Sequence, residues 1–112
     1  MSKVAFVPAF TREAKRLLKK YPSLAADLQA LFQRLATEPT HGISLGRNCY
    51  KIRLKIASKS TGSRGGARVI TCVVAVEDTV YLLSIFDKSE QDTLSDRRLK
   101  ELLQLLPSEG KL

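Results

Sequence analysis

Between positions 50 and 56 the chain alternates basic and apolar residues. The basic members of this run are Lys51, Arg53 and Lys55. The apolar members are Tyr50, Ile52, Leu54 and Ile56. Because successive side chains of a β-strand point to opposite faces, the run predicts a strand with three cations on one face and an apolar face behind them. The cations are expected roughly 6.5–7 Å apart, and a basic face of this kind favours a polyanion.

The basic character continues along the following loop and strand. Positions 51 to 70 contain six Lys or Arg and no Asp or Glu, and the later members of this set are Lys59, Arg64 and Arg68. An alternating charge pattern alone is typical of the solvated face of a sheet. A face that serves only solubility normally mixes both signs of charge, however. The single sign therefore favours an anionic ligand.

The composition predicts one globular domain over residues 1–112, since 44% of the residues are hydrophobic and 27% are charged. The net charge of +8 suits a nucleic-acid-binding protein, although an anionic membrane surface or an acidic protein would also fit it. No window approaches the ~18 apolar residues of a membrane span, and the N-terminus lacks the apolar run of a signal peptide. We therefore expect a cytoplasmic protein without a membrane partner, in which Cys49 and Cys72 are reduced.

Hydrophobic spacing divides the N-terminal half into a strand, two helices and a loop. Residues 3–7 predict an edge strand, and residues 10–21 predict a helix. A second helix is expected from Pro22 to the residue before Pro39, and a loop over residues 40–48. Because the junction between the helices is short, they are expected to form an antiparallel hairpin. The apolar stripe expected on the first helix is Phe10, Ala14, Leu17, Leu18 and Tyr21.

Strands are expected in the C-terminal half at 49–57, 66–76 and 79–86, with a tight turn at Glu77–Asp78 between the last two. The 66–76 strand is apolar on both faces, which predicts a central position in the sheet. A helix over 90–105, capped by Asp92 or Ser95, and a frayed tail at about 107–112 complete the chain. The predicted fold class is α+β, with an N-terminal strand and an antiparallel helical hairpin packed on a small antiparallel sheet, followed by a C-terminal helix.

Other chemically capable groups are few. His41 is the only histidine, and no Cys or acid lies at ligand spacing from it, so the sequence predicts no metal site and no cofactor. The glycine-rich stretch 60–66 is not a P-loop, because it lacks the G-x-x-x-x-G-K-[ST] pattern and no helix follows it. Phe86, at the end of the last strand, is the aromatic residue expected to be exposed and to stack on bases. Three acids follow it, with helix-start capping or tempering of a positive site as their alternative roles: Asp87, Glu90 and Asp92.

Four segments occur in a characteristic order along the chain: FTREAKRLLKKYPSL at 10–24, NCYKIRL at 48–54, GGARVI at 65–70 and VYLLSIFDKSE at 80–90. Together, and over nearly the whole chain from about 6 to 104, they resemble the RelE/ParE superfamily of type II toxin–antitoxin toxins, with the RelE and HigB branch as the closer match. Each segment is weakly specific alone, and the resemblance rests on their order and spacing. The fold of that family agrees with the predicted element order.

The resemblance implies a metal-independent endoribonuclease, an mRNA interferase that cuts the codon in the ribosomal A site and so inhibits translation. In this chemistry the 2′-hydroxyl attacks the adjacent phosphate and leaves a 2′,3′-cyclic phosphate or a 3′-phosphate. The implied partners are a cognate antitoxin protein, the ribosome and mRNA. Operator DNA would be contacted only through the antitoxin.

The resemblance also assigns roles to the basic residues. Lys51 and Arg53 match the basic strand positions of the family, Arg68 matches its arginine on the following strand, and Lys88 matches the basic residue after the last strand. We expect Arg68 and Lys88 to hold the scissile phosphate and Lys51 or Arg53 to assist proton transfer or charge stabilisation. Additional RNA-binding residues are expected at Lys55, Lys59, Arg64 and Phe86.

One departure affects these roles, because RelE has a C-terminal catalytic tyrosine and no tyrosine follows Tyr81 in this chain. HigB-like members often lack it as well. Two alternatives therefore stay open: a ParE-like toxin that poisons DNA gyrase, and an inactive RNA-binding or regulatory module of the same fold.

Overall fold

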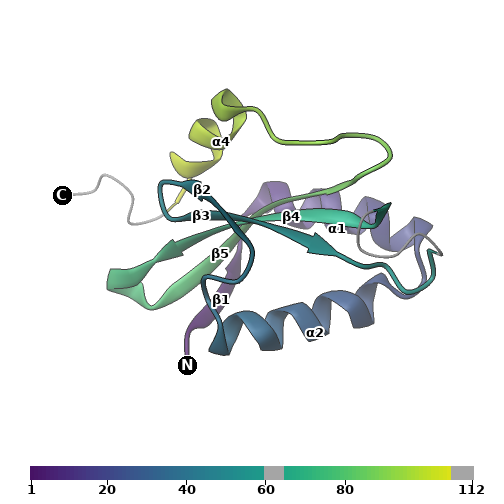
Figure 1. The fold of residues 1–112 in the computed structure, drawn as a ribbon, viewed down its shortest axis with the longest axis horizontal. Coiled ribbons are helices and arrows are strands. Elements are labelled where there is room, and N and C mark those ends of the chain that lie inside the picture. The colour runs from purple at the N-terminus through teal and green to yellow at the C-terminus, as the bar shows by residue number, and fades with distance from the viewer. Residues whose placement is uncertain (60–64, 107–112) are drawn as a thin grey trace.

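A mixed sheet lies at the centre of the computed structural model, which describes residues 1–59 and 65–106 (Figure 1). In this part of the chain the sheet has five strands in the order β1–β5–β4–β3–β2. The strands are β1 (Lys3–Phe6), β2 (Ile43–Gly46), β3 (Cys49–Leu54), β4 (Ala67–Val74) and β5 (Thr79–Asp87). The helices are α1 (Pro8–Lys20), α2 (Leu24–Thr37) and α4 (Asp96–Leu103), with a short 3-10 helix, η1 (Ala75–Glu77), before β5. The predicted α+β class is confirmed.

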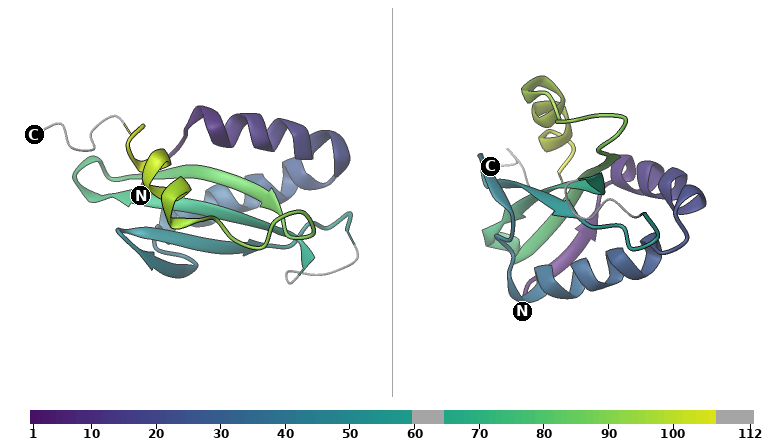
Figure 2. Two further views of the ribbon diagram at one scale, coloured as in Figure 1. Left: turned by 90° about the horizontal axis from the view of Figure 1, so that it is seen from above. Right: turned by 45° about the vertical axis from the view of Figure 1, so that its right-hand side comes forward.

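The middle strand is β4, as its apolar faces predicted. It pairs antiparallel with both β3 and β5, and residues 67–72 are all buried. The reason is that both faces of the sheet are covered: α2 and α4 lie on opposite sides of it, and α1 packs against β5 (Figures 1 and 2). The antiparallel meander of β3, β4 and β5 is therefore the frame that positions the basic residues.

The two edges of the sheet differ from the sequence prediction. β1 is an edge strand as expected, but it pairs parallel with β5, with Lys3 opposite Thr79, so the sheet is not wholly antiparallel. A short apolar run carries no information about the direction of its partner, which the path of the chain decides. β2 lies inside the predicted loop 40–48. Its residues are all exposed, so it lacks the alternation by which a half-buried strand is recognised.

Two turns between antiparallel strands use left-handed backbone conformations. Arg47 and Asn48 have φ of 53° and 60° and form the two-residue connection between β2 and β3, where positive φ at both positions matches the twist of the strands. Between β4 and β5, η1 replaces the predicted two-residue turn, and only Asp78 has positive φ, at 52°. This turn is longer than predicted because it lacks the glycine that a tight hairpin favours.

The predicted helical hairpin is confirmed, with adjusted ends. Pro8 occupies the first turn of α1, where a missing N–H costs nothing, and α2 begins at Leu24 rather than at Pro22. The stripe on α1 is buried at Phe10, Ala14 and Leu17, whereas Leu18 is exposed, which corrects its assignment to the core. Leu18 adjoins Leu17 in sequence and is therefore turned about 100° from it on a helix of 3.6 residues per turn.

The C-terminal helix is shorter than predicted. Its start is Asp96, not residue 90, and the Ser95 hydroxyl accepts a hydrogen bond from the Arg98 N–H as the N-cap. Residues 88–95 form a connection that passes over the sheet before α4 begins (Figures 1 and 2). The predicted tail at 107–112 and residues 60–64 of the glycine-rich stretch, Arg64 among them, lie outside the described residues.

Gly66 marks the closest approach between backbones at the start of β4. A Cβ built on Gly66 would lie 2.1 Å from the Leu54 carbonyl oxygen. The carbonyl oxygen of Gly66 also accepts a hydrogen bond from the Lys88 N–H at 3.0 Å, so a shift there displaces a predicted site residue.

We therefore expect Gly66→Ala to lower the free energy of unfolding by at least about 1–3 kcal/mol, the usual cost of inserting a group into packed structure. The control is Gly46→Ala, where φ is +81° but nothing lies within 4 Å of the added Cβ, so only the backbone strain of about 1 kcal/mol applies. Urea denaturation of both variants measures the difference. An equal or smaller loss at Gly66 would contradict the close approach.

Candidate nucleic-acid interface

Two arginines face each other across β3 and β4. Arg53 and Arg68 are directly opposite in the antiparallel register, so their side chains lie on the same face of the sheet. Arg53 is exposed and Arg68 is 3% exposed. Burial and the positive charge of Arg53 lower the pKa of Arg68, although an arginine stays protonated at neutral pH. Like charges placed opposite each other are destabilising. A bound anion would therefore reduce the repulsion between the two arginines.

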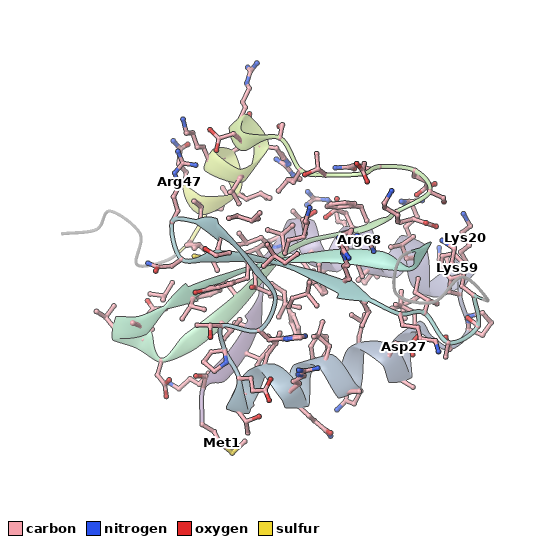
Figure 3. All side chains as sticks on the ribbon, viewed as in Figure 1. Met1, Lys20, Asp27, Arg47, Lys59 and Arg68 are labelled. Carbon is pink, nitrogen blue, oxygen red and sulfur yellow. The ribbon has the colours of Figure 1, made fainter. Side chains whose placement is uncertain are left out.

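Lys51 and Lys88 belong to the same electrostatic cluster. Lys88 follows β5, and its Nζ lies 2.6 Å from Oδ1 of Asp92. The hydrogen bond from Lys88 lowers the pKa of Asp92, and the charges of Lys51 and Arg68 lower it further. Figure 3 shows Arg68 on the side of the sheet over which the connection to α4 passes. We name Lys51, Arg53, Arg68 and Lys88 the basic cluster; the sequence placed all of them in the site, and the fold brings them together.

Lys59 does not join the basic cluster, and its RNA-binding role stays a prediction. Its Nζ lies 2.6 Å from Oδ1 of Asp87 and donates to the Gly65 carbonyl oxygen at 2.9 Å, and its side chain is only 16% exposed. Figure 3 shows Lys59 next to Lys20, at the end of the molecule where α1 stops. The reason is the buried Asp87 carboxylate, which a lysine charge must compensate.

The side chain of Asp87 holds distant segments of the chain together, a role that sequence reasoning missed. We call it the Asp87 anchor. Its carboxylate is fully buried and accepts hydrogen bonds from Lys59, from the Tyr21 hydroxyl, and from the N–H and hydroxyl of Ser89. Burial alone would raise the pKa of Asp87, but the hydrogen bonds from Lys59, Tyr21 and Ser89 outweigh burial and hold the pKa well below its ordinary value. The only signal in the sequence is an acid directly after an apolar strand, which also fits a helix cap.

Phe86 is buried at 3% exposure, so its predicted exposure is wrong, and its base-stacking role stays a prediction. It lies opposite Arg68 of β4 in the antiparallel register. A position at the end of a strand predicts exposure, whereas the fold buries this side chain. Lys55 is exposed beyond the end of β3, and its RNA-binding role stays a prediction.

The tyrosines take no part in the basic cluster. The Tyr21 hydroxyl donates to Asp87, and the Tyr81 hydroxyl donates to Glu77 at 2.6 Å, which raises the pKa of Tyr81 to about 12. Tyr50 lies opposite Thr71 in the sheet and is partly buried. None of these three tyrosines therefore takes the place of the C-terminal tyrosine of RelE.

His41 lies at the outer side of β3, in a pocket of about 270 Å³ shared with Arg34, Arg53 and Lys55. Burial and the charge of Arg34 lower the pKa of His41. Among residues 1–59 and 65–106, no group of three or more His, Cys, Asp or Glu could hold a metal ion. Over the same residues, no helix has the length and hydrophobicity needed to cross a lipid bilayer.

Comparison with known proteins matches this arrangement at the level of the fold. No protein-family model matches the chain. The isolated RelE toxin of Escherichia coli superposes with a TM-score of 0.59 at 16% identity, over 95% of this chain and 100% of the toxin. The chain has the RelE toxin fold. The intact E. coli RelBE toxin–antitoxin complex gives a TM-score of 0.60 at 19% identity, over 78% of this chain and 96% of that chain. The Mycobacterium tuberculosis RelBE2 complex gives 0.55 at 20% identity, over 77% and 90%. The resemblance predicted from the four segments is thus confirmed for the fold.

The Asp87 anchor predicts a specific loss of stability. Asp87→Asn leaves Lys59 without its carboxylate partner, and breaking a buried pair in this way costs about 3–5 kcal/mol. Thermal or urea denaturation at pH 7 measures the loss, with Glu101→Gln on the exposed side of α4 as the control.

The buried carboxylate of Asp87 also predicts how the stability of the protein changes with pH. Since the pKa of Asp87 is depressed in the folded state, its contribution to stability is complete above the ordinary aspartate pKa of about 4 and is lost progressively at lower pH. The Asp87→Asn variant should therefore lose less stability than the unaltered protein on acidification below about pH 4. Parallel pH profiles of the two proteins would contradict the anchor role.

Proposed function

We propose that this protein is the toxin of a type II toxin–antitoxin system and a member of the RelE/HigB-like branch of the RelE/ParE superfamily. It acts in the cytoplasm as a metal-independent endoribonuclease that cleaves mRNA on the ribosome and thereby inhibits translation. The observation that carries the proposal is the convergence of Lys51, Arg53, Arg68 and Lys88 on one face of a RelE-type sheet. The similarity of the fold to the RelE toxin and to the RelBE toxin–antitoxin complex supports the toxin class.

The basic cluster suits a transition state in which negative charge grows on a phosphate. The 2′-oxygen forms a bond to phosphorus, the bond from phosphorus to the 5′-oxygen breaks, and a 2′,3′-cyclic phosphate results. Arg68, held by its buried position, and Lys88, at the start of the connection, bind the non-bridging oxygens of the phosphate. Cations placed before the reaction stabilise the extra charge without further rearrangement.

Two protons must also move, one from the 2′-hydroxyl and one to the 5′-oxygen. A lysine can exchange a proton, whereas an arginine cannot serve as a base. Since Lys88 is assigned to the phosphate, Lys51 is the lysine assigned to proton transfer: its amine accepts the proton of the 2′-hydroxyl and returns one to the 5′-oxygen. Arg53 is assigned to charge stabilisation. The hydroxyls of Tyr21 and Tyr81 are bound to carboxylates, and Tyr50 alternates with Lys51 onto the other face of β3, so this assignment does not involve a phenol.

An antitoxin is the proposed protein partner. The similar RelBE structures are toxin–antitoxin complexes. The net charge of +8 favours an acidic partner over the basic face, and such a partner competes with RNA for it. Contact with operator DNA is assigned to the antitoxin.

The first experiment is induced expression of the chain alone in bacteria, with primer extension on a reporter mRNA that is either translated or not. New 5′ ends only on the translated message, together with growth arrest, are expected. Arrest with intact mRNA would contradict the nuclease and point to a ParE-like gyrase poison, which supercoiling by purified gyrase would test. Harmless expression would favour an inactive RNA-binding or regulatory module.

Single substitutions then test the roles of the basic cluster. Arg68→Ala and Lys88→Ala are each expected to slow cleavage about 10²–10³-fold, the usual effect of removing one group that stabilises transition-state charge. Arg97→Ala is the matched control, because it also removes one cation but from an α4 position whose side chain is 92% exposed. Cleavage rates on stalled ribosomes, compared with circular dichroism of each variant, separate loss of chemistry from loss of fold. Full activity in Lys51→Ala, Arg68→Ala and Lys88→Ala would refute the site.

A further inference from the structure

Asp87, the last residue of β5, and the two acids after it, Glu90 and Asp92, have separate surroundings. Asp87 is buried and holds Lys59 and Tyr21. Glu90 pairs with Arg16 of α1, its Oε1 lying 2.9 Å from Nη2. Asp92 pairs with Lys88 at 2.6 Å. Only the last of these three contacts places a carboxylate on a member of the basic cluster.

The charge of Asp92 acts on more of the basic cluster than its hydrogen-bond partner. Its pKa is lowered first by the hydrogen bond from Lys88 and also by the charges of Lys51 and Arg68. In the opposite direction, the negative charge of Asp92 raises the pKa of Arg68 against the effects of burial and of Arg53. Asp92 therefore partly neutralises three of the four cations that the proposed function assigns to one phosphate.

The contact is built so that it can open. The Asp92 side chain is 78% exposed, that of Lys88 is 36% exposed, and Asp92 lies in the connection 88–95 and not in a helix or strand. An exposed ion pair of this kind contributes little to stability and is easily exchanged. The buried Asp87 pair, one residue from Lys88, is not exchangeable in the same way because its carboxylate is fully buried.

We propose that Asp92 is an internal counterion, whose carboxylate occupies the anion position of the basic cluster in the RNA-free protein and is displaced by a phosphodiester group of the RNA. Asp92 thereby sets the affinity for RNA and its salt dependence. The identity of the anion as RNA rests on the proposed function, whereas the exchange itself needs only a polyanion.

The test is binding of a fluorescein-labelled 2′-O-methyl RNA oligonucleotide, which cannot be cleaved through its 2′-oxygen, measured by anisotropy from low to moderate salt. Asp92→Asn is compared with the unaltered protein and with Asp96→Asn. The control removes the same charge from a carboxylate that pairs with Arg47 at 2.7 Å and with Lys100 at 3.4 Å, outside the basic cluster.

We expect Asp92→Asn to bind the oligonucleotide about fivefold more tightly at low salt, in line with the strength of an exposed ion pair. The slope of log affinity against log salt should steepen by about 0.7, because one more cation becomes available to a phosphate of a single strand. Asp96→Asn should change affinity less, and in a Lys88→Ala background the effect of Asp92→Asn should become smaller, because the ion pair with Lys88 is then absent.

Equal effects of the two substitutions would overturn the proposal, since only the net charge would then matter. Weaker binding by Asp92→Asn would also overturn it and indicate that the carboxylate contacts the RNA favourably. Absence of binding by every protein at low salt would overturn the anion position itself. If neither the unaltered protein nor any variant cleaves mRNA on the ribosome but the binding results are as expected, the proposed function is refuted and the counterion role of Asp92 is supported.

Discussion

The buried carboxylate of Asp87 is the constraint on which the arrangement of the site depends. It joins the end of α1, through Tyr21, to the connection that follows β3, through Lys59, and to the residues after β5, through Ser89. A fully buried carboxylate without cationic and hydrogen-bond partners would be too costly to keep ionised. These distant segments are therefore held together at one end of the sheet, and the backbone of Lys88 is held with them by its hydrogen bond to Gly66.

The alternation of side chains along a strand separates this anchor from the basic cluster. Asp87 and Lys88 are neighbours in sequence, yet one is bound among Lys59 and Tyr21 and the other lies with Asp92, Arg68 and Lys51. Lys59 compensates the anchor and is thereby removed from the cations that face a ligand. The basic cluster keeps an excess of positive charge, because Asp92 is exposed and neutralises it only in part. Arg53 and Arg68 lie opposite each other, and the repulsion between their like charges costs stability. Such an arrangement is typical of a position prepared for an anion.

The likeness to RelE structures and the composition of the site carry different information. The TM-scores of 0.55–0.60 at 16–20% identity establish the fold. A shared fold does not transfer an activity, which must be argued from the residues of the site. Here Arg53 and Arg68 lie on one face of the sheet, with Lys51 and Lys88 in the same electrostatic cluster, while the hydroxyls of Tyr21 and Tyr81 are bound to carboxylates. The chemistry proposed for this chain therefore relies on charge stabilisation by Arg53, Arg68 and Lys88 and on a proton-carrying lysine.

The sequence by itself determined the α+β class, the central position of β4, the helical hairpin and the basic face of β3. These features follow from local periodicity: alternation with period two separated Lys51 and Arg53 from Ile52 and Leu54, and helical spacing marked α1 and α2. Only the tertiary structure decided the parallel pairing of β1, the existence of the exposed strand β2, the burial of Phe86 and the partners of Lys59, Asp87 and Asp92. Those outcomes depend on contacts between residues far apart in the chain, such as the 28 positions that separate Lys59 from Asp87. A local pattern identifies which face of an element is charged, but the partner of each charge is selected by the path of the chain through space.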